Sequence, residues 1–395
     1  MKTAIVILNW NTRDYLEKFL PGVLRSAGCS AEGYPSGQTS VIVADSASTD
    51  GSMELVEKSF PGVGRIPLKE NYGFTGGYNR ALRILEGMPE EETEPRILPG
   101  GEIPEEFRNL KYNYYILLNS DIESEGDWIT PLVSWMDSHP ETGACAPFLH
   151  SYFDRESFEY AGAAGGLLDP MGFPLCRGRV LKTLEKDHGQ YSSGNVLWGT
   201  GACLMVRSSL FHALGGLDHR FFAHMEEIDL CWRMQLSGYK VRAIQGSGVY
   251  HLGGGTLAPD SPFKLRLNYR NNLLLLENNV PCTMALSLRH SSPDALPENI
   301  ARKACRKASR KIFLRMVIDG LTAIAYLLQG KMQYFKAVIS SHKEFKSLRK
   351  GISTERVLQY TKLSGKDTEV TGIICKYIIP TGVLRPGRML ESLHG

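Results

Sequence analysis

Short, almost wholly apolar runs alternate with longer segments of helical periodicity through the first half of the sequence. Each run has the length of one strand and lacks the polar alternation of a half-solvated strand, which is the pattern of burial on both faces. Strand, helix and strand in succession predict an α/β fold with a mostly parallel sheet flanked by helices. In such a sheet the ligand crevice lies outside the carboxyl ends of the strands. The four runs are 4–8, 41–45, 64–68 and 114–119.

The length and the change of pattern along the chain suggest two parts. At 395 residues the chain exceeds one average domain. Before about residue 261 it carries the alternation of strands and helices, and after it the pattern is helical and rich in Leu, Lys and Arg. We therefore expect an α/β domain over 1–260 and a helical C-terminal extension over 261–395. Residues 88–110 are rich in Glu and Pro without periodicity, which predicts a solvated loop.

Charge and cysteine content restrict the class of protein. The 45 basic and 42 acidic residues nearly balance, so nothing indicates a nucleic-acid partner. None of the eight cysteines forms a C-x-x-C pair, which favours free thiols in a reducing cytoplasm. No run of about 18 uncharged apolar residues occurs, so we expect no membrane span. The sequence leaves the oligomeric state unknown.

Small and polar residues follow each of the predicted strands. Taken singly they are ordinary loop residues, but in a parallel sheet the carboxyl ends of the strands share one edge. The turn after the first strand, NWNTRD, lacks the G-x-G-x-x-G of a dinucleotide site, so a nucleotide with a metal-bound diphosphate fits better. The residues expected along this edge are Asn9, Asn11, Asp45, Asn71, Gly76, Gly77, Asn79, Asn119 and Asp121.

The segment LLNSD, which ends at Asp121, has two interpretations. Asn, Ser and Asp hydrogen-bond their own backbone and commonly end strands, so the segment fits a simple turn. A carboxylate at the mouth of a buried strand also suits a divalent cation beside a diphosphate, because hard cations prefer oxygen ligands.

Six motifs in order resemble glycosyltransferase family 2, the inverting enzymes of the GT-A fold, and most closely their rhamnosyltransferase-like branch. The resemblance covers roughly residues 3–280 and implies a GT-A, Rossmann-like sheet. It makes 1–260 the nucleotide-sugar-binding and catalytic domain. The motifs are VILNWN, VADSASTDGS, ENYGFTGGYNRAL, LLNSD, the segment 199–241 with HMEEIDLCWRMQL at its centre, and VYHLGGGT.

The resemblance implies roles for the residues at the sheet edge. Asp45 and Asn11 would meet the nucleobase and ribose, and Asp121 would hold Mg²⁺ or Mn²⁺ together with His251. The family often has an acid where this chain has Asn119, and an amide oxygen ligates a cation without charge. Without the family, His251 would read as a structural histidine. The remaining nucleotide-sugar contacts would come from Asn9, Asn71, Gly76, Gly77, Asn79 and Asn119.

The acids in HMEEIDLCWR also have two interpretations. Acids in the first turn of a helix interact favourably with its dipole, and Asp229 and Arg233 are spaced as an i,i+4 pair. The resemblance instead implies that Glu227 is the catalytic base and that Glu226 and Asp229 form its acidic surroundings. Neighbouring carboxylates raise one another's pKa, which helps a base that works near neutral pH.

These residues predict an inverting glycosyltransferase with a nucleotide-diphosphate sugar as donor. The resemblance suggests dTDP-rhamnose, a glycan or lipid-linked acceptor and a role in cell-surface polysaccharide synthesis. A sugar nucleotidyltransferase is the first alternative, although it would need a Gly-rich basic loop after the first strand. A non-catalytic glycan- or nucleotide-binding relative is the second, and the acids Asp45, Asp121, Glu227 and Asp229 argue against it.

A basic segment in the extension bears on location. Seven Lys and Arg residues between Arg302 and Arg315 cover a broad helical face, opposite a weakly apolar stripe. A solvated helix face is one interpretation. The other is peripheral contact through 301–350 with an anionic bilayer, at the inner face of the cell membrane.

Overall fold

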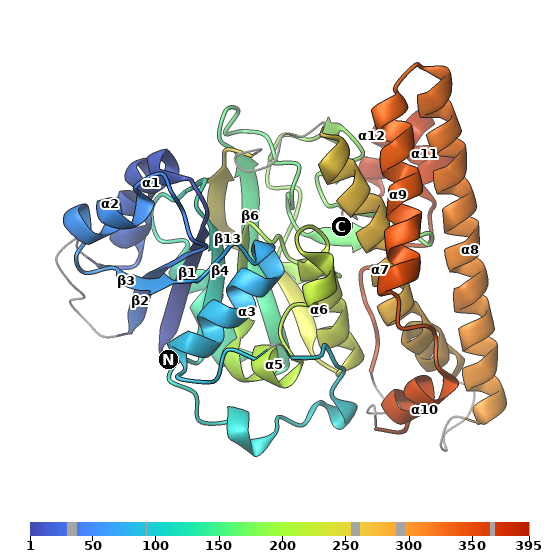
Figure 1. Ribbon diagram of the computed structural model, residues 1–395, viewed down its shortest axis with the longest axis horizontal. Coiled ribbons are helices and arrows are strands. Elements are labelled where there is room, and N and C mark those ends of the chain that lie inside the picture. The colour runs from blue at the N-terminus through green and yellow to red at the C-terminus, as the bar shows by residue number, and fades with distance from the viewer. Residues whose placement is uncertain (30–37, 92, 254–260, 290–296, 364–367, 395) are drawn as a thin grey trace.

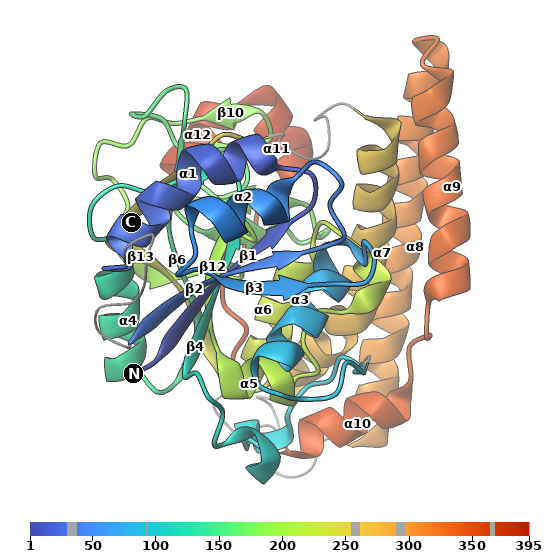
Figure 2. The ribbon, with the colours of Figure 1, turned by 60° about the vertical axis from the view of Figure 1, so that its left-hand side comes forward.

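The computed structural model describes residues 1–29, 38–91, 93–253, 261–289, 297–363 and 368–394. Figures 1 and 2 show one sheet with helices on both sides, and a group of long helices to one side of it. The expected α/β architecture is confirmed.

The large sheet is mixed, and the expected parallel half is present. Its order is β11-β13-β6-β12-β4-β1-β2-β3, with β5 added against β13. Strands β1 to β4 pair in parallel, β6 pairs in parallel with β13, and β12 lies antiparallel between β4 and β6. The strands are β1 (Thr3–Asn9), β2 (Thr39–Asp45), β3 (Gly64–Pro67), β4 (Tyr114–Asn119), β5 (Ile122–Glu123), β6 (Thr142–Ser151), β11 (Gly194–Asn195), β12 (Cys203–Arg207) and β13 (Lys240–His251).

Both faces of the sheet are buried, as the apolar runs predict. Ile5 and Ile7 of β1 belong to one apolar core, whereas Ala4 and Val6 belong to the other. The first core is covered by α1 (Arg13–Ser26), α2 (Ser52–Ser59) and α4 (Ile129–Ser138). The second is covered by α3 (Gly73–Leu85), α5 (Ser208–Ala213) and α6 (Glu226–Leu236).

The helical part after residue 261 shares the second core instead of forming one of its own. Buried leucines of α7 and alanines of α8 join the residues of α3 and α6 in a single cluster. Figure 1 shows α8 and α9 as a long pair at the side farthest from β3. None of the described helices is both long and apolar enough to cross a bilayer. The helices are α7 (Pro262–Arg289), α8 (Glu298–Leu328), α9 (Met332–Leu348), α10 (Thr354–Leu363), α11 (Ile378–Leu384) and α12 (Pro386–Glu391).

The end of the chain returns to a small antiparallel sheet. Leu168 exchanges backbone hydrogen bonds with Gly372 and Ile374, and Ile378 and Met389 are buried against the same sheet. The sheet has the order β10-β9-β8-β7. Its strands are β7 (Gly166–Leu168), β8 (Pro174–Cys176), β9 (Arg179–Val180) and β10 (Thr183–Leu184).

The segment 88–110 is not wholly the solvated loop expected from its composition. It contains two 3-10 turns, η1 (Pro99–Gly101) and η2 (Glu105–Phe107). Ile97 and Leu98 are buried in the second core, and the Leu98 backbone N–H donates to the Ser237 hydroxyl. The two apolar side chains anchor the middle of the segment. The high Glu and Pro content around them led to the prediction of a solvated loop.

A buried ion pair connects α6 to its surroundings. Asp229 and Arg233 are almost fully buried, and the Arg233 Nε lies 2.7 Å from an Asp229 carboxylate oxygen. The other Asp229 oxygen accepts hydrogen bonds from Asn278 and Asn279 of α7 at 2.9 and 2.8 Å. Arg233 also donates to the Leu214 and Gly216 carbonyl oxygens. The spacing predicted the pair, but only the fold supplies the asparagines that satisfy its acid.

We expect Arg233→Met to lower the free energy of unfolding by about 3–5 kcal/mol, because it leaves the Asp229 carboxylate buried without its cation. Replacing both residues, as in Asp229→Leu with Arg233→Met, should recover part of the loss. Arg65→Met is the control, since Arg65 and Glu57 form an exposed pair 3.7 Å apart that should contribute less than about 1 kcal/mol. Urea unfolding measures all three, and equal losses for Arg233→Met and Arg65→Met would contradict the assignment.

Candidate active site

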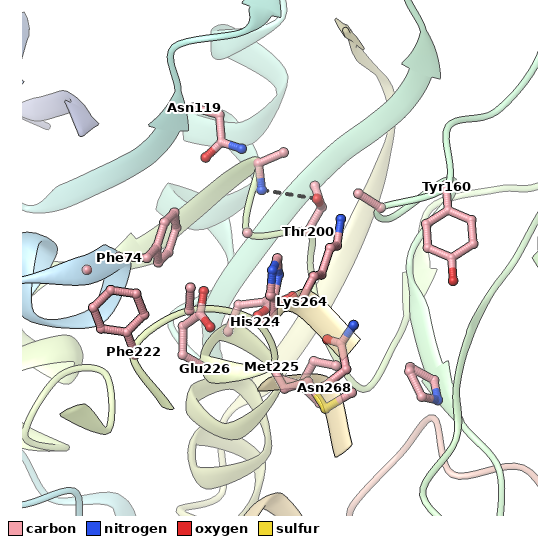
Figure 3. Close-up of a pocket in the computed structure, with 18 of the residues that line it drawn as sticks. Phe74, Asn119, Tyr160, Thr200, Phe222, His224, Met225, Glu226, Lys264 and Asn268 are labelled. Atoms are coloured by element: carbon pink, nitrogen blue, oxygen red, sulfur yellow. Dashed lines mark hydrogen bonds between the residues drawn. The ribbon is translucent and has the colours of Figure 1, made fainter. Parts of the chain in front are cut away.

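A cavity of about 700 Å³ joins the carboxyl edge of the sheet to the helical part of the chain. Figure 3 shows Asn119 of β4, Glu226 of α6 and Lys264 of α7 converging on it from different elements. Of the residues predicted from sequence, those that line it are Asn9, Asn71, Asn119, Asp121, Glu226, Glu227 and His251.

The remaining predicted residues lie outside the cavity wall and support it. Asp45 is buried, and its carboxylate accepts hydrogen bonds from the Asn9 amide at 2.6 Å and from the Ser48 backbone N–H at 2.9 Å. Asn11 holds the same loop, because its side-chain oxygen accepts from the Thr49 backbone N–H. Asp45 and Asn11 therefore shape the rim beside the cavity residues Asn9 and Ser46.

The four residues predicted in the segment after β3 separate into one cavity residue and three packing residues. Asn71 lines the cavity and accepts from the Gly73 backbone N–H at 2.9 Å. A side chain at Gly77 would lie 2.8 Å from Leu8, so this glycine lets α3 approach β1, and Gly76 packs as closely against Tyr72. Asn79 is bonded to both backbone groups of Leu217, at 2.7 and 2.9 Å. It thereby holds the segment that leads into α6.

Asp121 and His251 are adjacent in space, as the predicted metal pair requires. Residue His251 pairs with Ile122 across β13 and β5, which brings its Nε2 to 3.3 Å from an Asp121 oxygen. Its Nδ1 lies 3.3 Å from a Glu159 oxygen. Burial alone would lower the pKa of His251, but hydrogen bonds and charge from Asp121 and Glu159 raise it to about 10. The Gly254–Thr256 end of the His251 motif lies outside the described residues.

The two side chains suit a hard divalent cation. One carboxylate oxygen and one imidazole nitrogen fit Mg²⁺ or Mn²⁺, with diphosphate oxygens completing the shell. The cation would replace the proton that Asp121 now shares with His251. The described residues contain no group of three or more protein ligands, so the pair alone would be a weak site without the nucleotide.

The two glutamates at the start of α6 differ in environment. Glu226 is buried, and burial together with the charge of Glu227 raises its pKa well above the usual range. Glu227 is less buried, and desolvation raises its pKa to about 7 against the opposing effect of backbone N–H groups. One oxygen of each carboxylate has no hydrogen-bond partner among the described residues. Near neutral pH, Glu226 is protonated and Glu227 is the group that can accept a proton. Asp229, by contrast, is engaged with Arg233 and does not line the cavity.

A strained loop presents these glutamates. Phe222, His224 and Met225 have positive φ values of 63°, 70° and 69°, a conformation that costs free energy in residues other than glycine. The amide of Asn271 donates to the carbonyl oxygens of Phe221, Ala223 and His224 at 3.0, 2.7 and 2.7 Å. Because α7 fixes three carbonyls within this loop, it compensates the strain and sets the position of Glu226.

Sequence reasoning missed the contribution of α7 and α8 to the cavity. The signal available was the cluster of asparagines and basic residues inside a Leu-rich helical segment, NYRNNLLLLENN. Amides that interrupt an apolar helix must find partners when buried. The cavity residues from these two helices are Phe263, Lys264, Asn268, Tyr269, Asn272 and Arg315.

Residues 4–87 match the family model of Glycosyl transferase family 2. In this first part the chain is similar to glycosyltransferase family 2. It is 24% identical over 279 residues to the N-acetylglucosaminyl-diphospho-decaprenol L-rhamnosyltransferase of Mycobacterium tuberculosis, covering 69% of this chain and 83% of that relative. It is also 24% identical over 163 residues to the rhamnosyltransferase WbbL of Escherichia coli, covering 38% of this chain and 56% of that one.

Among solved structures, the mannosyltransferase PcManGT of Pyrobaculum calidifontis, in complex with GDP-Man and Mn²⁺, matches with a TM-score of 0.45 and 12% identity over 87% of each chain. The similarity to these glycosyltransferases favours a nucleotide-sugar-dependent glycosyltransferase over a sugar nucleotidyltransferase. The cavity described above is the candidate active site of this glycosyltransferase.

Proposed function

We propose that this protein is an inverting rhamnosyltransferase that moves rhamnose from dTDP-rhamnose to a lipid-linked glycan acceptor in cell-surface polysaccharide synthesis. The observation that carries the proposal is that the Asp121 and His251 pair and the Glu226 and Glu227 pair line one cavity. One bound substrate complex could therefore reach both pairs. Asp121 and His251 would lie beside the leaving diphosphate, and Glu227, whose pKa is raised to about 7, would serve as the base. The names of the Mycobacterium tuberculosis and Escherichia coli relatives support the choice of sugar.

The donor binds along the carboxyl edge of the sheet. The nucleotide lies at the rim formed by Asn9, Asn11 and Asp45, and the diphosphate extends toward Asn119 and Asp121. Asp121 and His251 would hold Mg²⁺ or Mn²⁺, which supplies positive charge to the leaving diphosphate. Asn71 also lines the cavity and is available to the donor.

The chemical step uses Glu227 as general base. An acceptor hydroxyl oxygen attacks the anomeric carbon, its proton passes to a Glu227 oxygen, and the bond from that carbon to the diphosphate oxygen breaks. One displacement inverts the anomeric carbon and requires no covalent enzyme intermediate. The neutral Glu226 beside it adds no second negative charge against the approaching acceptor. Asp229 acts only through the position of α6.

We expect Glu227→Gln to lower kcat by about 10²- to 10⁴-fold with little change in donor Kd, because it removes the base and leaves the sheet edge intact. Glu226→Gln should cost less than about tenfold, since glutamine resembles the protonated Glu226. In the unsubstituted enzyme kcat/KM should fall about tenfold per pH unit below pH 7, where Glu227 becomes protonated, and level off above it. Measuring kcat and donor Kd for both variants tests the assignment. A larger loss at Glu226, or loss of donor binding at Glu227, would move the base by one residue.

We expect a chelator to abolish transfer and added Mg²⁺ or Mn²⁺ to restore it. Titration calorimetry provides a readout besides activity, because dTDP should bind more tightly with Mn²⁺ than without it, and Asp121→Asn should remove that difference. Glu123→Gln is the matched control, since Glu123 lies two residues away and pairs with Arg155 at 2.5 Å. Full transfer in excess chelator would show that no cation takes part.

We also propose that the enzyme works in the cytoplasm, bound peripherally to the inner face of the cell membrane through 301–350. The support is the outward face of α8. Its first half exposes bases, and its second half exposes large apolar side chains, among them Phe313 at 69% and Leu328 at 83% exposure. At 100° per residue these side chains fall within about 160° around the axis. The exposed basic and large apolar residues of this face are Arg302, Lys303, Arg306, Lys307, Arg310, Phe313, Leu314, Val317, Leu321, Ile324, Leu327 and Leu328.

An anionic bilayer is the partner that matches both halves of this face. The only acid of α8 after Glu298 is Asp319, which is buried against Arg315. A second copy of the chain would bring the two rows of bases toward one another, whereas lipid headgroups would neutralise them. The row of apolar side chains could enter the boundary between headgroups and acyl chains. In Figures 1 and 2 the α8–α9 pair lies at the outer edge of the molecule, where a flat surface can reach it.

We expect replacement of Arg306, Lys307 and Arg310 by Gln to weaken binding to phosphatidylglycerol-containing vesicles roughly a hundredfold, because each base contributes about 1 kcal/mol. Replacement of Leu321, Ile324 and Leu328 by Ser should weaken vesicle binding at every salt concentration, because salt does not screen the free energy gained by burying apolar side chains in the bilayer. The control replaces the exposed Lys58, Lys69 and Lys182 by Gln. Vesicle sedimentation measures all three. A dimer that the Ser variant dissociates, without any vesicle binding, would contradict the proposal.

A further inference from the structure

One buried cation in the cavity has no role in the mechanism above. Arg179 of β9 is only 4% exposed, yet its side chain lines the cavity. Among the described residues it forms no ion pair, and its Nε has no hydrogen-bond partner. Its other nitrogens have weak partners, the Pro174 carbonyl oxygen at 3.4 Å and the Cys176 sulfur at 3.3 Å. The guanidinium lies 4.5 Å over the Tyr160 ring.

Such an arrangement is costly unless something else compensates the charge. Taking a guanidinium out of water is unfavourable, and buried arginines are normally paired with an acid. Two other buried arginines nearby have strong partners, either an acid or backbone carbonyl oxygens. Arg315 pairs with Asp319 at 2.8 Å, and Arg177 donates to the Ala164 and Ser192 carbonyl oxygens at 2.8 and 2.9 Å. The Nη2 of Arg177 also lacks a partner among the described residues, but Arg177 does not line the cavity. Arg179 is therefore the one of these three that both lines the cavity and has an unpartnered nitrogen.

We infer that Arg179 is a binding site for a diphosphate group of the substrate. A planar guanidinium with one unpartnered and two weakly bonded nitrogens can bind phosphate oxygens. A bound anion would also supply the negative charge that no ion pair of the protein provides. Figure 3 shows Lys264 among the side chains that line the same cavity, so the cavity wall carries a second cation. This inference rests on the proposed function for the identity of the substrate.

The diphosphate could belong to the donor or to a lipid-linked acceptor, and the surroundings favour the acceptor. Arg179 belongs to the small sheet, and its neighbours in the cavity wall are Phe173, Pro174 and Leu181. Arg315 of α8 lines the same region, and α8 is the helix that carries the exposed apolar face. The donor diphosphate already has Asp121 and His251 at the sheet edge. An acceptor whose lipid lies in the membrane beside α8 would bring its diphosphate to Arg179.

The decisive variant is Arg179→Met, which keeps the length of the side chain and removes the charge. Without substrate it should leave the melting temperature unchanged or raise it, because an uncompensated buried cation is lost. The KM for a diphospholipid acceptor should rise roughly 10- to 100-fold, since hydrogen bonds between charged partners are lost. The Kd for dTDP should not change, and Arg179→Lys should recover part of the affinity. Arg177→Met is the matched control, and it should lower the melting temperature because its carbonyl partners lose their donor.

Inorganic pyrophosphate gives a readout that does not depend on catalysis. In the absence of a divalent cation it should raise the melting temperature of the unsubstituted protein and not that of Arg179→Met. An increase in dTDP Kd with an unchanged acceptor KM would instead assign Arg179 to the donor diphosphate. The inference is overturned if Arg179→Met alters neither affinity, or if it lowers the melting temperature as Arg177→Met does. Because the pyrophosphate result needs no transfer, it stands or fails separately from the role of Glu227.

Discussion

The buried pair of Asp229 and Arg233 is the interaction on which the geometry of the active site depends. Its acid is completed by Asn278 and Asn279 from α7, and its base by carbonyl oxygens of the segment before α6. A buried ion pair adds little stability over apolar packing, but losing one partner is expensive. The pair therefore acts chiefly as a constraint. It allows one position of α6 against α7, and that position determines where Glu226 and Glu227 enter the cavity.

The same helix, α7, compensates the strain in the loop before α6. Three residues with positive φ would relax to ordinary conformations if the loop were free. The amide of Asn271 opposes this by holding three carbonyl oxygens at once. The loop held in this way places Glu226 and Glu227 at the cavity. The two residues are neighbours in sequence but have different surroundings. One carboxyl group is then neutral and the other can accept a proton near pH 7, a difference that two equivalent exposed glutamates would not have.

The active site is shared between the two parts of the chain. The sheet edge supplies amides and the metal pair, whereas α7 and α8 supply Lys264, Asn272 and Arg315. The extension expected over 261–395 is thus part of the cavity wall and part of the second core. Its outward surface, on the far side of the same helices, is the proposed membrane contact. A glycosyltransferase arranged in this way would keep its acceptor side next to the bilayer and its donor side open to the nucleotide-sugar.

The sequence alone determined the βαβ pattern and the edge at which the site would form, because apolar runs of strand length report burial directly and parallel strands end together. It also determined the i,i+4 pair of Asp229 and Arg233, whose spacing is local. Only the tertiary structure decided which polar residues face the cavity. Asn79, Asp45 and Asp229 resembled cavity residues in sequence, yet they hold loops and helices, while Arg179 and Arg315 line the cavity without a comparable signal. Strand and helix periodicity depends on neighbours a few residues apart. The partners of the buried amides of Asn271 and Asn279 lie about 50 residues away in the sequence, and they come together only when the chain packs.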